Sequence, residues 1–232
     1  MDRRQFTHFT TNILLVTSVS PAWVHAATLS ELSNKDATAG LKAALDKGAA
    51  SAIALLGANN GFLGNDKVRI PLPGYLNDAA GLLRTLGQGQ QVDELITAMN
   101  RGAEAAVPKA KALLTRAVQN MSVDDAKGIL AGGNTAVTDF FASKTRAGLG
   151  TEFLPIVTQA TQKLGLAAKY NQLAGKGAEL GLVKKEDANI QQYVTAKALD
   201  GLYLMIGEEE KKIRQNPVAY GSAILSKVFG AL

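Results

Sequence analysis

Cysteine is absent from this chain, and its two histidines, His8 and His25, and its one tryptophan, Trp23, all lie within the first 26 residues. A chain without cysteine forms no disulfide, no iron–sulfur cluster and no cysteine-based zinc site. From residue 27 onward there is also no histidine, so that part cannot form a Ser-His-Asp triad. These absences exclude most strong catalytic signatures, and we expect neither a cofactor nor a bound metal ion.

Long apolar runs and large clusters of basic residues are missing as well. After residue 26, each uninterrupted apolar run is well below the ~20 residues that span a bilayer, so we predict no transmembrane segment there. Lysine and arginine outnumber aspartate and glutamate only by 25 to 20, and they are dispersed. Nucleic-acid binding needs basic residues gathered on one face, so the sequence predicts no nucleic-acid partner.

The first 26 residues are typical of a cleavable export signal. They combine a positive start at Arg3-Arg4, a short apolar segment that begins at 13–16 and a small-residue site that ends at Ala26. We therefore predict a signal peptide over 1–26, cleavage near Ala26 and a periplasmic protein. Phe6 after the arginine pair resembles the twin-arginine pattern, so the twin-arginine and general secretory routes both stay open.

Apolar residues recur at helical spacing almost throughout the remaining chain, and runs of β-branched residues are few. This pattern predicts an all-α fold: an irregular multi-helix bundle, built as a single domain over 27–232. We predict helices over 36–56, 76–86, 90–120 with a break at Pro108, a short helix capped by Ser122, 135–149, 152–164, 167–182 and 188–216, and a last helix after Pro217.

The longest non-helical stretch is predicted over 58–73, where glycine, asparagine and aspartate indicate turns. Within it, Val68, Ile70 and Leu72 alternate with polar residues and proline in a short extended segment. One interpretation is that the three apolar side chains hold this connection against the bundle. The other is that the segment, with its two cations, covers a groove or pairs with a partner.

Several short strings, in this order, resemble one protein family: Gly61-Phe62-Leu63, Ile70-Pro71-Leu72-Pro73, Met99-Asn100-Arg101, Phe153-Leu154-Pro155-Ile156-Val157, Tyr170-Asn171 and Ala198-Leu199-Asp200-Gly201-Leu202-Tyr203. They are similar to strings of the DUF4197 family. The resemblance covers nearly all of residues 27–232 and implies an exported, mostly helical bacterial protein. It implies no activity, catalytic residue or cofactor.

Four residues form the candidate ligand site: Arg69, Asn100, Arg101 and Tyr170. Asn100 and Arg101 could project into a groove and hold an anion, since the arginine side chain can grip a carboxylate or phosphate with two hydrogen bonds. Alternatively, Arg101 makes an ordinary surface pair with Glu104, three residues on. Tyr170 is interpreted either as a residue lining a pocket or as a core residue with its hydroxyl at the rim.

Three functions remain compatible with these observations. The first is a non-enzymatic exported protein that binds an unidentified ligand or envelope protein. The second is a cell-envelope hydrolase with two carboxylates roughly 5–10 Å apart, for which Glu104, Asp139 and Glu152 are the candidates. The third is a carrier of lipid or another apolar ligand in a cavity between helices. The triplet Glu208-Glu209-Glu210 is interpreted as a solvated helix face.

Overall fold

The computed structural model describes residues 34–133 and 135–216. The predicted signal peptide and the predicted helix after Pro217 lie outside the described residues. Helices make up most of the described chain, and no strand occurs in these two ranges. The prediction of an all-α, multi-helix fold is confirmed.

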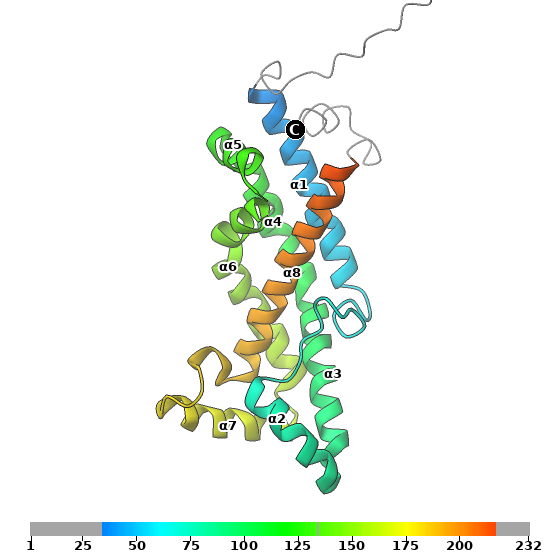
Figure 1. Cartoon of the computed structure of the whole chain (residues 1–232), viewed down its shortest axis with the longest axis vertical. Helices are drawn as coiled ribbons and strands as arrows, with labels where there is room; N and C mark the ends of the chain where they lie inside the picture. The colour runs from blue at the N-terminus through cyan, green and yellow to red at the C-terminus, as the bar shows by residue number, and fades with distance from the viewer. Residues whose placement is uncertain (1–33, 134, 217–232) are drawn as a thin grey trace, which may run out of the picture.

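Four long helical elements run alternately in opposite directions and form the body of the molecule (Figure 1). They are α1 (Asn34–Leu56), α3 (Gly89–Ala106) continued by α4 (Ala110–Gln119), α6 (Ala136–Thr161) and α8 (Ile190–Gln215). Three shorter helices lie at the ends. α5 (Val123–Ala131) lies at the upper end in Figure 1, and α2 (Gly74–Leu83) and α7 (Gly165–Glu179) lie at the lower end.

Helix α8 packs mainly against α6 and α1, and it supplies much of the core. Its side chains Leu199, Leu202 and Ile206 are buried at helical spacing, as are Leu41 and Leu45 of α1. A helix of this kind is stabilised by burying one apolar stripe rather than by its own propensity. These residues therefore form the core-facing stripes of α1 and α8.

The predicted break at Pro108 is confirmed by a 3-10 turn over Val107–Lys109 that separates α3 from α4. Proline lacks an amide hydrogen and crowds the preceding turn, which interrupts the regular pattern of helical hydrogen bonds. The proline ring packs over the end of α1, since a Cβ atom on Gly57 would lie 3.1 Å from its Cγ. The break thus joins α1 to the α3–α4 element.

The predicted pair of helices over 135–149 and 152–164 is wrong, because α6 is one helix of 26 residues. Pro155 lies inside this helix at an exposed position. The backbone hydrogen bond that proline cannot donate is therefore lost on the solvent side of the helix. On the opposite side, Leu149, Phe153 and Val157 are fully buried. Continuous burial of this apolar stripe keeps the helix intact through the proline.

Candidate functional site

Asn100 fastens the loop over 57–73 to helix α3 from inside the protein. Its side chain is fully buried, and its Oδ1 accepts a hydrogen bond from the Ile70 amide at 2.8 Å. Its Nδ2 donates to the Ile70 carbonyl at 3.0 Å and to the Ile96 carbonyl at 2.8 Å. Asn100 therefore satisfies both backbone groups of Ile70, much as a neighbouring strand would.

Glu104 holds the first half of the same loop, one helical turn further along α3. Its Oε1 accepts hydrogen bonds from the amides of Phe62 and Leu63, each at 3.0 Å. Its Oε2 accepts from Nη1 of Arg101 at 2.6 Å, and Nη2 of Arg101 donates to Asn60 at 2.9 Å. Glu104 is buried, so its pair with Arg101 is not the ordinary surface pair that the sequence suggested.

The alternation predicted for the second half of the loop is confirmed. Val68, Ile70 and Leu72 are buried, whereas Lys67 and Arg69 are exposed. The apolar side chains hold the connection against the bundle and, as a consequence, direct the cations outward.

Helix α8 meets this loop at a glycine and at an ion pair. A Cβ atom on Gly201 would lie 2.8 Å from the Phe62 ring and 3.3 Å from Val68, so only glycine allows this close approach. Lys67 pairs with Glu208 at 2.8 Å. Hydrogen bonds from Lys67 and Lys211 lower the pKa of Glu208 to about 2. The loop is therefore fixed against α8 as well as α3.

An open groove of about 300 Å³ lies between this loop and α8. Arg69 and Lys67 line one side, and Tyr193, Lys197 and Asp200 of α8 line the other. The Lys197 ammonium lies 5.8 Å from the centre of the Tyr193 ring. Within residues 34–133 and 135–216, neither Arg69 nor Lys197 forms an ion pair with a carboxylate.

Tyr193 forms an aromatic wall of this groove and stays neutral. Burial, reinforced by the negative charge of Asp187 and by neighbouring Tyr170, raises the pKa of Tyr193 to about 12. Tyr170 is itself buried, and its hydroxyl donates to the backbone carbonyl of Asp187 at 2.5 Å. Burial also raises the pKa of Tyr170.

The structure brings three of the four predicted site residues to one loop, but on different sides of it. Arg69 faces the groove, Asn100 lies behind the loop, and Arg101 contacts its other half through Asn60. Tyr170 does not line the groove, although it lies near enough to Tyr193 to affect the pKa of that side chain. Tyr193 and Lys197 were not predicted from the sequence, although their spacing of four residues on a helix places them on one face.

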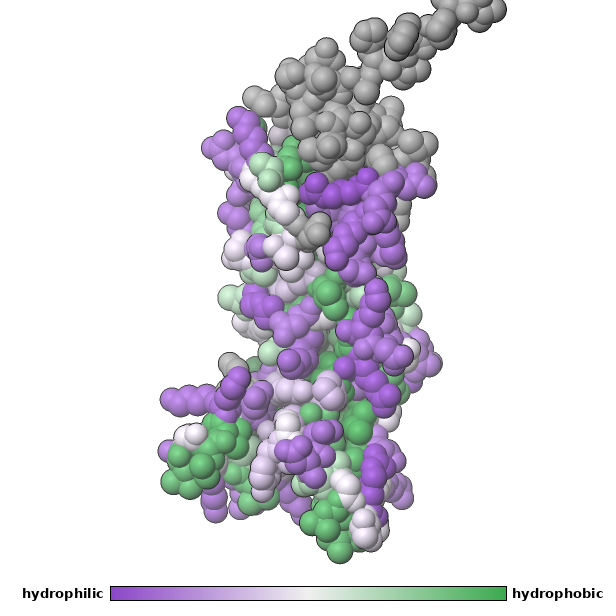
Figure 2. All heavy atoms as spheres, viewed as in Figure 1, coloured by the Kyte–Doolittle hydropathy of each residue, from purple (hydrophilic) through white to green (hydrophobic). Residues whose placement is uncertain are grey.

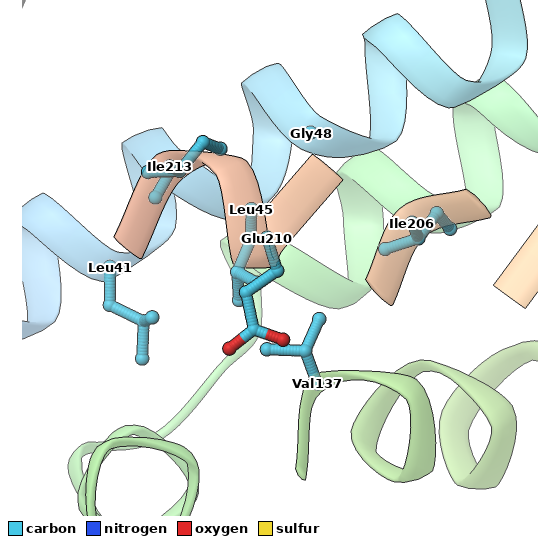
Figure 3. A pocket seen from close by; sticks show the side chains of 8 residues that line it. Leu41, Leu45, Gly48, Val137, Ile206, Glu210 and Ile213 are labelled. Carbon is cyan, nitrogen blue, oxygen red and sulfur yellow. The ribbon is translucent and has the colours of Figure 1, made fainter. Parts of the chain in front are cut away.

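The bundle interior holds a small apolar void between α1, α6 and α8 (Figure 3). Its volume is about 10 Å³, which is room for about one water molecule and too little for an acyl chain. Glu210 lines it, together with apolar side chains such as Leu41 and Val137. This void is therefore too small to hold the ligand of the predicted lipid carrier.

The prediction of a solvated face over 208–210 is wrong for two of the three glutamates. Glu209 and Glu210 are each only 5% exposed. Glu209 accepts hydrogen bonds from Ser51 at 2.9 Å and from Lys212 at 2.6 Å, and Arg214 donates to Glu210 at 2.6 Å. Burial raises the pKa of Glu210 despite this bond.

The carboxylates suggested for a hydrolase are not arranged as a catalytic pair. Glu104 has both oxygens occupied by the loop amides and Arg101. Asp139 and Glu152 are both exposed on α6, about 20 Å apart at a rise of about 1.5 Å per residue. A glycosidase pair requires a separation of roughly 5–10 Å. The described geometry therefore gives no support to this alternative.

A family model described as "Protein of unknown function (DUF4197)" matches residues 31–230, nearly the whole chain. The chain belongs to the DUF4197 family. No curated protein and no solved structure is significantly similar to it. Among the described helices, none combines the length and apolar character needed to cross a bilayer. The family and the all-α fold are thus established.

Proposed function

We propose that this DUF4197 protein is an exported, non-enzymatic binding protein, a single domain over 27–232 that holds an anionic group in the groove between its 57–73 loop and α8. The supporting observation is the pair of exposed cations, Arg69 and Lys197, on opposite sides of the groove. Neither is neutralised by a described carboxylate. A carboxylate or phosphate between them would gain two charge-assisted contacts.

The rigid attachment of the loop supports this proposal. Asn100 and Glu104 fix its backbone from inside, so Arg69 is presented from a prearranged segment. A preformed site loses less conformational entropy when its ligand binds. In this proposal Asn100 and Arg101 position the loop, and Arg69 contacts the ligand. Tyr170 supports Tyr193 at the far wall.

The composition of the groove favours binding over catalysis. Its walls carry cations, a neutral tyrosine and Asp200, which is paired with Arg146 at 2.7 Å. Burial raises the pKa of Tyr193 to about 12, further from neutral pH than that of an ordinary tyrosine, so its hydroxyl is poorly matched to acid–base catalysis. The groove suits an anionic ligand or an acidic segment of an envelope protein.

Calorimetric titration with inorganic phosphate and with a short polyglutamate peptide tests this proposal. The double variant Arg69→Gln/Lys197→Gln should weaken binding of whichever anion the protein takes by at least about tenfold, and added salt should weaken wild-type binding. The matched control is Lys111→Gln/Lys127→Gln, which removes two exposed cations elsewhere. Equal loss in both variants, or no binding of either anion, would refute the groove as the site.

Export is tested separately on the protein recovered from its own periplasm. Mass spectrometry under denaturing conditions should give a chain that begins at Ala27, and the same sample under native conditions should carry the extra mass of its ligand. Recovery only from the cytoplasm, with residues 1–26 still attached, would contradict the proposed location without affecting the groove.

A further inference from the structure

The groove between the 57–73 loop and α8 contains apolar surface beside Arg69 and Lys197. Leu204 of α8 lines it and is 44% exposed, and Pro71 lines it from an exposed position of the loop. Figure 2 shows hydrophobic residues among hydrophilic ones on the face of the molecule that carries α8. A bare anion such as phosphate would leave this apolar surface in water, so the groove suits an anionic group joined to an apolar one.

The charge of the groove lining favours an anion. Three cations and one carboxylate line it, which is an excess of two positive charges. Lys67 and Asp200 have ion-pair partners of their own, whereas Arg69 and Lys197 have no carboxylate partner in the described part of the chain. Asp187 acts on the tyrosine of the groove but does not line the groove itself. The excess charge therefore resides on two cations that a ligand can reach.

A cation and the exposed leucine lie on one stripe of α8. Tyr193, Lys197, Gly201 and Leu204 are spaced by three or four residues, which places them on one helical face. Lys197 and Leu204 are about 10 Å apart at a rise of about 1.5 Å per residue. The Lys197 ammonium lies over the Tyr193 ring, 5.8 Å from its centre, and so on the side away from Leu204. The stripe thus offers an anion site and, further along, an apolar site.

The loop runs along this stripe in the opposite direction. Lys67 pairs with Glu208, and a Cβ atom on Gly201 would lie 3.3 Å from Val68. Residue numbers in the loop therefore rise as those in α8 fall, and Arg69 follows toward the N-terminal half of α8. The two unpaired cations thus flank the same end of the groove, away from the exposed leucine.

We propose that the groove binds an unstructured protein segment in which an acidic residue and an apolar residue are three positions apart, an inference that rests on the anion site proposed above. The acidic side chain lies between Arg69 and Lys197, and the apolar side chain packs against Leu204. A polyproline II chain has three residues per turn and a rise of about 3.1 Å, so residues three apart share one side at about 9 Å. This separation matches the two sites of the groove.

A free fatty acid carries the same two kinds of group but fits the groove less well. Its hydrocarbon chain gains from a continuous apolar cavity that removes it from water. Here Leu204 and Pro71 are single exposed side chains in an open groove, and the charged side chain of Asp200 lies between the anion site and Leu204 along α8. A peptide can pass this carboxylate with its polar backbone and place one apolar side chain beyond it.

Fluorescence anisotropy with labelled, end-capped peptides tests the proposal. Each peptide is a glycine–serine chain that carries one glutamate and, three positions away, one leucine, and both orders of the two residues are made. For the order that binds more tightly, replacing leucine by serine should weaken binding by at least about threefold. Moving the leucine next to the glutamate should weaken it similarly. Octanoate should displace the peptide no better than acetate does.

Leu204→Ser should reduce binding of the leucine peptide to the level of the serine peptide. The matched control is Leu173→Ser, which removes a leucine that is 60% exposed on α7 and should keep the preference for leucine. A preference that survives in Leu204→Ser, a wild type that does not distinguish the two peptides or binds neither, or displacement by octanoate that depends on Leu204 would overturn the inference. The anion site fails separately, if Arg69→Gln/Lys197→Gln binds the serine peptide as the wild type does.

Discussion

Replacing Asn100 by alanine tests whether the loop is held from inside the bundle. The substitution removes three hydrogen bonds of 2.8–3.0 Å and leaves the amide and carbonyl of buried Ile70 without their partner. Each unsatisfied buried group costs about 1–3 kcal/mol, and alanine returns roughly 0.5 kcal/mol through its higher helix propensity. We expect the free energy of unfolding to fall by about 2–5 kcal/mol, a large part of a typical total of about 5–15 kcal/mol.

Urea denaturation followed by circular dichroism measures this loss. Hydrogen exchange adds a local measurement, because the Ile70 amide should lose protection before the core of α6 does. Asn77→Ala, at an exposed position of α2, is the control and should change the free energy of unfolding by no more than about 0.5 kcal/mol. A loss below about 1 kcal/mol in Asn100→Ala, with normal protection at Ile70, would refute the reasoning.

Three further changes have defined outcomes. Gly201→Ala brings a Cβ atom to 2.8 Å from a buried ring and should lower the free energy of unfolding by about 1–3 kcal/mol, whereas Gly150→Ala, with open space around it, should raise it by about 0.5–1 kcal/mol in the same urea titration. Burial raises the pKa of Glu210 in the folded state above its usual 4.5. The contribution of protonated Glu210 to the free energy of unfolding is therefore lost as the pH rises through the folded-state pKa. The stability of Glu210→Gln relative to wild type should therefore increase with pH in denaturation series, and a constant difference would contradict this. Tyr170→Phe removes a hydrogen bond to a backbone carbonyl and should cost about 0.5–1.5 kcal/mol, measured as a lower melting temperature.

Most of the helices could be predicted from the sequence, because the residues that start or end a helix act within a few positions of its boundary. Pro108 interrupts a helix by its own geometry, and Ser122 caps its helix as predicted, in a capping box with Asp125. The error at α6 has the opposite cause. Glycines and Pro155 weaken that helix locally, but burial of Leu149 and Phe153 against other helices keeps it continuous. Tertiary packing decides such cases, and a single sequence does not display it.

The candidate site could be predicted only in part for a similar reason. Arg69 was found because alternation with buried neighbours directs it outward, a property of the loop alone. Tyr193 and Lys197 were missed because they form a groove only together with the loop, which lies more than a hundred residues earlier in the sequence. Asn100 was selected as a possible ligand contact from its residue type. Its hydrogen bonds to Ile70 show instead why an asparagine stands at a fully buried helical position.

The three consecutive glutamates of α8 lie in three different environments. Consecutive residues on a helix point about 100° apart, so a triplet cannot lie wholly on one face. Glu208 faces the loop and pairs with Lys67, whereas Glu209 reaches Ser51 of α1 and Glu210 borders the apolar void. Burial of a carboxylate is costly unless it is paired, and each buried glutamate has a cation three or four residues later. Lys212 and Arg214 thus pair with the two buried carboxylates, and this pairing allows α8 to carry glutamates where it packs against α1.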